Sequence, residues 1–143
     1  MASALPMDPT AELVFVYGTL KRGQANHHWL SGAPWRGEIV LAGLVLHDLG
    51  PFPMAVEGEG TVRGELYAVD AAGLARLDVL EGYPRLYTRQ TRPLPDGRRA
   101  WVYVGRAAQV RHAPQLPDGT WHGGSRSRRG SRPDRQGGPA AAD

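Results

Sequence analysis

The stretch that decides the fold is VFVYGTLKRG, residues 14–23. Leu13 to Tyr17 are all apolar or aromatic, which is typical of a central strand buried on both faces. The run breaks off at Gly18, and small or turn-forming residues follow as far as Gly23. A glycine turn after a strand leaves backbone N–H groups open to a ligand, so it can hold an anion or an oxyanion. Glycine also ends many strands for the sake of the turn alone, and these residues by themselves leave both interpretations open.

The residues downstream predict mostly strands. Pro95-Asp96-Gly97 is the strongest hairpin signal, and Gly58-Glu59-Gly60 fits a second hairpin connection. The sequence predicts strands over residues 12–17, 38–49 (bent at Gly43), 54–57, 61–69, 86–94 and 98–105, and one or two helical turns over 24–30. Because parallel strand–helix–strand alternation is absent, this order predicts an α+β fold with a partly closed, mostly β sheet and helices at its side.

The clearest predicted helix runs from Asp70 to Leu80. The Asp70 carboxylate can accept the first free N–H groups of a helix, and Leu74 and Leu77 begin an apolar stripe that Leu80 extends. Gly82 is well placed as the glycine that ends a helix.

Glu81 is the candidate for chemistry. It lies at or just past the last helical turn, where the helix dipole disfavours an anion by roughly 0.3–1 kcal/mol, and its neighbours Leu80 and Tyr83 are apolar or aromatic. Desolvation and the helix C-terminus both act to raise the pKa of a carboxyl, as a general base working near neutral pH requires. The alternative is an exposed glutamate before a glycine cap. Asp78, on the same helix, is expected to be solvated.

Other signals for chemistry are weaker. Tyr17, Tyr67, Tyr87 and Tyr103 all fall on predicted strands, where core packing explains most tyrosines. The chain has none of the HExxH, GxSxG, GxxxxGK[ST] or GxGxxG motifs, so no motif supports a metal, serine or nucleotide mechanism.

Composition indicates one soluble domain and a separate basic tail. The 143 residues can bury a real core, and there is no cysteine for a disulfide or a thiolate site. We expect a cytoplasmic protein, since no apolar run approaches a membrane span and the N-terminus does not resemble a secretory signal. We expect the folded domain to cover residues 12–123. Residues 124–143 hold no apolar residue larger than alanine and are expected to be disordered.

The positive charge belongs to that tail. Five of the seventeen basic residues and two of the fourteen acidic residues lie in 124–143, which leaves twelve of each in 1–123. The folded part is therefore neutral, and no nucleic-acid partner is expected.

Two signatures resemble the γ-glutamylcyclotransferase-like (AIG2-like) family. The first is the stretch 14–23 together with Asn26. The second begins with Gly64-Glu65-Leu66-Tyr67 and continues as LDxxEGxPxxYxR over residues 77–89. The strand AWVYV, residues 100–104, is similar to the last core strand of the family. The Tyr-Gly-Thr-Leu form is closer to the γ-glutamylamine cyclotransferase branch.

The resemblance implies a small mixed β-barrel with flanking helices and no metal or cofactor. It implies a reaction that turns a γ-glutamyl amide into 5-oxoproline and a free amine or amino acid. Glu81 matches the essential glutamate of the family, and Tyr17, Gly18, Thr19 and Leu20 match its substrate-holding loop. From the residues alone, Tyr87 or Tyr103 could add a hydroxyl donor.

Two alternatives stay open. The same scaffold could bind a γ-glutamyl or other small carboxylate metabolite without turnover, or the Arg/Gly tail could contact RNA. If the protein is the cyclotransferase that the resemblance implies, its expected partner is a small γ-glutamyl substrate, and no membrane partner is expected.

Overall fold

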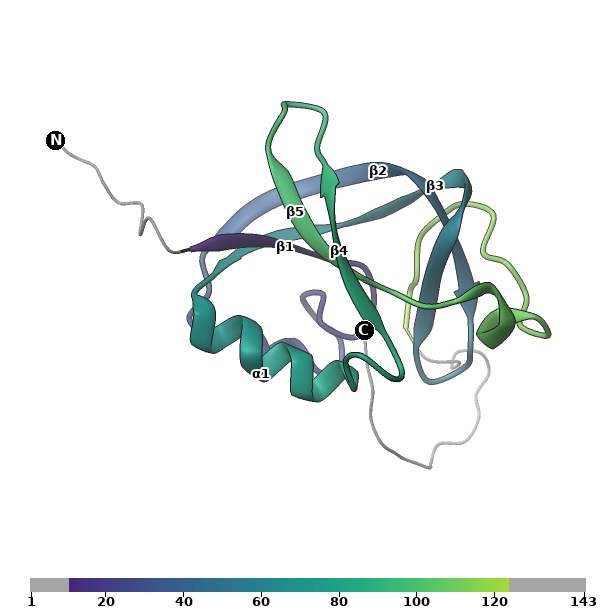
Figure 1. The fold of residues 1–143 in the computed structure, drawn as a ribbon, viewed down its shortest axis with the longest axis horizontal. Coiled ribbons are helices and arrows are strands. Elements are labelled where there is room, and N and C mark those ends of the chain that lie inside the picture. Colours follow the sequence, from purple (N-terminus) through teal and green to yellow (C-terminus); the bar gives the residue numbers. More distant parts are fainter. Residues whose placement is uncertain (1–10, 124–143) are drawn as a thin grey trace, which may run out of the picture.

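The computed structural model describes residues 11–123, which form a mixed five-stranded sheet curled into a half-barrel (Figure 1). The strand order is β2-β3-β1-β5-β4, and only the β1–β5 pair is parallel. The strands are β1 (Glu12–Val16), β2 (Trp35–Asp48), β3 (Pro53–Val69), β4 (Thr88–Pro93) and β5 (Arg99–Val104). The helices are α1 (Ala71–Glu81) and two 3-10 turns, η1 (His27–Leu30) and η2 (Ala107–Val110). The predicted α+β class is confirmed, with one α-helix among residues 11–123.

β1 is the central strand, as its apolar run predicts. It pairs with β3 on one side and with β5 on the other. Val14 and Val16 pack into a cluster with α1 and η1, which we call the helix-side cluster. Phe15 and Tyr17 pack into a cluster on the opposite side of the sheet, which we call the barrel cluster. The strand therefore supplies both halves of the core.

The hairpin predicted at Gly58-Glu59-Gly60 is wrong, because β3 continues through these residues as one strand. The pairing of β2 with β3 shifts between Ala42 and Leu44, with the glycine segment opposite Gly43. A Cβ on Gly58 would lie 2.7 Å from a Val45 methyl. The glycines thus allow β2 and β3 to approach closely at an irregular bend, not a turn. The predicted bend at Gly43 is confirmed.

The predicted helix is confirmed with both of its ends. The Asp70 carboxylate accepts the Gly73 N–H at 2.7 Å, and Gly82 ends α1 in the left-handed conformation. Leu74 and Leu77 are buried against the sheet. In Figure 1, α1 lies along one face of the sheet with its C-terminal end toward the β4–β5 hairpin.

Hydrogen bonds between β3 and β5 close the half-barrel. The Tyr17 hydroxyl donates to the Tyr103 carbonyl at 2.7 Å and accepts from the Ala55 N–H at 3.1 Å. The Gly105 N–H donates to the Ala55 carbonyl at 2.8 Å. Tyr17 is fully buried, so its phenol joins two strands that are not neighbours in the sheet.

Replacing Tyr17 by phenylalanine will lower stability by about 2 kcal/mol, because it leaves a buried carbonyl and a buried N–H without the shared hydroxyl. Urea denaturation measures the change. Tyr83→Phe is the matched control, since the Tyr83 side chain is 41% exposed. Equal stability of the Tyr17 and Tyr83 variants would refute this closing role.

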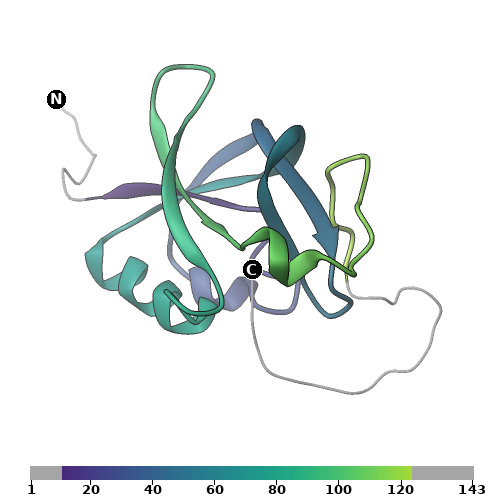
Figure 2. The same ribbon diagram turned by 45° about the vertical axis from the view of Figure 1, so that its right-hand side comes forward.

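Residues 105–123, the C-terminal part of the described chain, pack against β2 and β3 (Figure 2). η2 follows β5 and begins this part of the chain. The Leu116 N–H then bonds to the Leu46 carbonyl and the Arg63 N–H to the Gly119 carbonyl, both at 2.8 Å. Within residues 11–123, no helix is long and apolar enough to cross a membrane. The tail expected at 124–143 lies outside the described residues.

Candidate active site

The loop after β1 is a tight turn held by its own polar groups. The Lys21 N–H donates to the Gly18 carbonyl at 3.0 Å. Thr19 is buried; its carbonyl accepts the Asn26 N–H at 2.8 Å and its hydroxyl accepts the Asn26 amide at 3.0 Å. The Leu20 side chain has no solvent exposure and belongs to the helix-side cluster. The loop is therefore a fixed element in the described structure.

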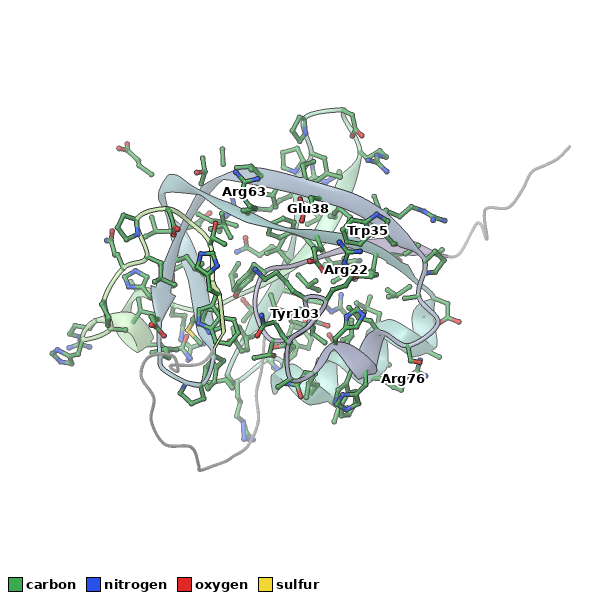
Figure 3. The ribbon with its side chains drawn as sticks, turned by 180° about the vertical axis from the view of Figure 1, so that it is seen from behind. Arg22, Trp35, Glu38, Arg63, Arg76 and Tyr103 are labelled. Carbon is green, nitrogen blue, oxygen red and sulfur yellow. The ribbon has the colours of Figure 1, made fainter. Side chains whose placement is uncertain are left out.

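A buried carboxylate on β3 anchors the far end of this loop. One oxygen of Glu65 accepts the Arg22 N–H at 2.9 Å and the Tyr67 hydroxyl at 3.0 Å. Glu65 is only 7% exposed. Burial and the bond to Glu65 raise the pKa of Tyr67, so the phenol stays a donor. The Arg22 guanidinium stacks 3.9 Å over the Trp35 ring, and Figure 3 shows the two side chains together.

Replacing Glu65 by alanine will free the loop and lower stability by about 2 kcal/mol, since it leaves the Arg22 N–H and the buried Tyr67 hydroxyl without their acceptor. Glu65→Gln keeps an oxygen that can accept both bonds and will lose less than half as much. Urea denaturation and hydrogen exchange at the Arg22 amide measure the two effects. Glu38, exposed and directly opposite Glu65 on β2, supplies the control Glu38→Ala. Unchanged Arg22 exchange in Glu65→Ala would contradict the anchor.

Glu81 is the last residue of α1 and has no solvent exposure. It follows Leu77 by one helical turn, so it continues the buried stripe of the helix. Leu80 packs against the helix-side cluster, as the sequence predicts. The alternative of an exposed glutamate before a glycine cap is therefore wrong.

Asp78 ties the end of α1 to the sheet. The Arg89 guanidinium donates to both Asp78 oxygens, at 2.6 and 2.9 Å, and the Tyr103 hydroxyl donates to one of them at 2.7 Å. Arg89 in turn lies over the rings of Tyr83 and Trp101, at 5.0 and 4.4 Å. The expectation that Asp78 is solvated is wrong, because β4 and β5 bring two donors to it.

The hydrogen bonds among Asp78, Arg89 and Tyr103 shift the pKa values of these residues. Burial by itself would raise the pKa of the Asp78 carboxyl, but the bonds from Arg89 and Tyr103 outweigh burial and hold that pKa below its usual value. Burial, the bond to Asp78 and the nearby charges of Asp78 and Glu81 together raise the pKa of Tyr103. Tyr103 is therefore a neutral donor to Asp78, and the charge of Glu81 acts on its pKa in the same direction.

The structure brings most of the sequence-predicted residues to one side of the sheet. Leu20, Tyr87 and Tyr103 share the helix-side cluster with Leu77, and Glu81 lies one turn beyond Leu77. The Tyr87 hydroxyl donates to the Pro53 carbonyl at 2.8 Å. The phenol of Tyr17, in contrast, lies in the barrel cluster on the opposite side of the sheet. Only the main chain of Tyr17 continues into the loop at Gly18.

Sequence reasoning from single residues missed three members of this region: Glu65, Asp78 and Arg89. Glu65 had a usable signal, since it is the one acidic residue on a predicted strand face that also carries Tyr67 and Val69. Asp78 precedes Glu81 by three residues on the same helix, a spacing that places both on neighbouring parts of one face. Arg89 has its partner eleven residues away, and its only signal in the sequence is its place at the end of the second signature.

Comparison with known proteins agrees with this architecture. A model of the family described as gamma-glutamyl cyclotransferase, AIG2-like, matches residues 14–123. The gamma-glutamylcyclotransferase family protein YtfP of Escherichia coli K12 is 44% identical over 91 residues, which are 64% of this chain and 80% of the relative.

Two animal proteins are also similar. Human gamma-glutamylaminecyclotransferase is 42% identical over 91 residues, covering 54% of this chain and 58% of the human protein. The crystal structure of an AIG2-like protein from Mus musculus matches with a TM-score of 0.66 and 29% identity, over 87% of this chain and 99% of the mouse chain. The family match spans most of the chain, and the chain therefore belongs to the gamma-glutamyl cyclotransferase, AIG2-like family.

Proposed function

We propose that this protein is a γ-glutamyl amide cyclotransferase that releases 5-oxoproline and a free amine or amino acid. The observation that carries the proposal is a fully buried carboxylate, Glu81, at the end of α1 on the side of the sheet that also holds Leu20 of the glycine loop. A buried carboxylate is costly to maintain, and such groups concentrate at sites of proton transfer.

In the proposed reaction the α-amine of the substrate attacks its own γ-carbonyl carbon. A nitrogen–carbon bond forms, the γ-amide carbon–nitrogen bond breaks, and two protons move from the α-ammonium group to the leaving nitrogen, which departs as an ammonium ion. The atoms and electrons balance without an oxidant, a reductant or a metal, so we propose that no cofactor takes part. The nucleophile is tethered, and holding the substrate in a ring-like pose supplies much of the rate, because well-placed intramolecular attack has a very large effective molarity.

We assign the proton transfers to Glu81. It accepts a proton from the α-ammonium group, which makes the amine nucleophilic, and then donates that proton to the departing nitrogen. One carboxylate that alternates between base and acid can repeat the transfer for the second proton, which the α-nitrogen loses after it has bonded to the carbonyl carbon.

We assign substrate binding to the loop. The main chain of Tyr17, Gly18, Thr19 and Leu20 holds the γ-glutamyl group, with N–H groups toward the α-carboxylate and the developing oxyanion. The bonds from Asn26 to Thr19 and from Glu65 to Arg22 support this role, because they fix the loop before substrate arrives. Tyr87 and Tyr103 contribute the wall of the site through their rings, since their hydroxyls already bond to Pro53 and Asp78.

The relative named for γ-glutamylamine indicates the substrate class to test first. We propose γ-glutamyl-amines, then γ-glutamyl-amino acids, as small molecules met in the cytoplasm. The test incubates the purified protein with a panel of both kinds and measures 5-oxoproline by chromatography. We expect release from at least one member, and a panel without any 5-oxoproline would refute the proposal.

A further inference from the structure

A cavity lies against the N-terminal part of α1, on the side of Leu77 away from Glu81. Its volume is about 440 Å³, within the range of small-molecule sites. The walls are the first half of α1, the linker from η1 into β2, the end of β3 and the start of β1. Leu77 is the wall residue nearest to Glu81 along α1, and it precedes Glu81 by four residues, or about 6 Å along the helix axis. Neither Glu81 nor the loop 18–20 lines it.

Three arginines from separate elements line the cavity: Arg36 of β2, Arg76 of α1 and Arg98 of the β4–β5 turn. Arg98 pairs with Asp96 at 2.7 Å. The Arg36 guanidinium bonds only to the carbonyl of its neighbour Trp35, and Arg76 has no hydrogen-bond or ion-pair partner among residues 11–123. Two guanidinium groups are thus available to an anion here.

Two acidic side chains also line the cavity, and each accepts a hydrogen bond from a neutral N–H group. The Glu12 carboxylate accepts the Trp101 indole N–H, and Asp70 caps Gly73. Gly73 itself is buried in the wall, and a Cβ there would lie 3.7 Å from an Arg76 guanidinium nitrogen. Arg76 therefore folds back along the helix over Gly73, where an Asp70 carboxylate oxygen would lie 3.2 Å from the same Cβ. Neither acid forms an ion pair with Arg76 within residues 11–123, and three arginines against two acids leave the cavity wall with a net positive charge.

The remaining wall is largely apolar. Trp29, Leu30, Leu13 and Leu77 contribute to it, and Leu30 and Leu77 are buried members of the helix-side cluster. Exposed arginines without a carboxylate partner also occur elsewhere, for example Arg63 and Arg111, but these do not line the cavity. Arg36 and Arg76 differ because they flank a concave surface with an aromatic and aliphatic wall.

We propose that this cavity binds a small organic anion with an apolar body, in which a carboxylate, sulfonate or phosphate meets Arg36 and Arg76 and the apolar part packs on Trp29 and Leu30. Arginine suits such groups because its planar donors match their oxygens. The apolar wall favours a ligand that carries a hydrocarbon or aromatic group over an inorganic ion without one. The proposal is independent of the cyclotransferase reaction.

The test titrates the full-length protein with 8-anilinonaphthalene-1-sulfonate, followed by its fluorescence, and in parallel with the neutral N-phenyl-1-naphthylamine, which has the same apolar body. We expect saturable sulfonate binding that Arg36→Ala/Arg76→Ala weakens about tenfold, as loss of two partly exposed charge-assisted contacts predicts. Affinity for the neutral probe should stay unchanged. Added NaCl should weaken sulfonate binding more in the wild type than in the variant.

The matched control is Arg63→Ala/Arg111→Ala, which removes the same charge outside the cavity; Figure 3 shows Arg63 far from Arg76. The control should bind the sulfonate like the wild type. Circular dichroism confirms that all variants are folded. Absence of saturable binding, an equal loss in the control, or an equal loss for the neutral probe would each overturn the proposal. Glu81→Gln should leave sulfonate binding unchanged, so this result stands apart from that of the 5-oxoproline assay.

Discussion

Glu81→Gln will reduce 5-oxoproline release by about a thousandfold or more, within the range expected when the group that transfers protons is lost. The substitution keeps the shape of the side chain and removes its ability to accept a proton. Because Glu81 is fully buried at the end of α1, no neighbouring water can readily take over the transfer. The measurement compares initial rates on the best substrate of the panel.

The same variant separates catalysis from binding. We expect Glu81→Gln to bind substrate and to unfold within about 1 kcal/mol of the wild type, because a buried neutral amide costs less than a buried charge. Glu59→Gln, an exposed glutamate on β3, is the matched control and should retain full activity. Substantial turnover by Glu81→Gln would remove Glu81 as the proton carrier. A wild type that binds but does not turn over any substrate would instead favour a metabolite-binding module.

Gly64→Ala will lower stability by about 3 kcal/mol, a large effect for one methyl group. A Cβ on Gly64 would lie 2.4 Å from the Val16 carbonyl oxygen and 2.7 Å from the Phe15 ring. Both belong to the central strand β1, and backbone cannot yield as a flexible side chain can. At this chain length the loss corresponds to a fall in melting temperature of about 10 °C.

Thermal unfolding followed by circular dichroism measures this effect. The control is Thr61→Ala, at an exposed position of the same strand, which should change stability by less than about 0.5 kcal/mol. A wild-type melting temperature for Gly64→Ala would show that β1 and β3 are not packed as closely as described. The prediction also gives the Gly64 of the second signature a structural role, distinct from that of Glu81.

Local sequence predicted the elements whose signals are themselves local. The apolar run before Gly18 identified the central strand, and Asp70 and Gly82 marked the two ends of α1. The turn at Pro95-Asp96-Gly97 joins β4 to β5 as expected, with the Gly97 N–H bonded to the Leu94 carbonyl at 2.9 Å. Capping and turn chemistry involve residues a few positions apart, so a single sequence contains them.

The errors share a different cause. Gly58-Glu59-Gly60 has the composition of a turn, but the partner strand opposite Gly43 makes it a bend within β3. Asp78 has the local features of a solvated helix residue, but β4 and β5 supply Arg89 and Tyr103. In both cases the deciding atoms belong to residues distant in the chain.

The sequence by itself determined the central strand, its glycine loop, the capped helix and, through two spaced signatures, the family. Those features depend on side-chain type and short spacing. Only the tertiary structure decided which groups meet: the burial of Glu81, its coupling to Tyr103, the Glu65 anchor on the loop and the placement of the Tyr17 phenol on the opposite side of the sheet. These depend on strand register and on the packing of α1 against the sheet. Both are set by contacts between residues far apart in the chain, and local sequence does not indicate which of those residues will meet.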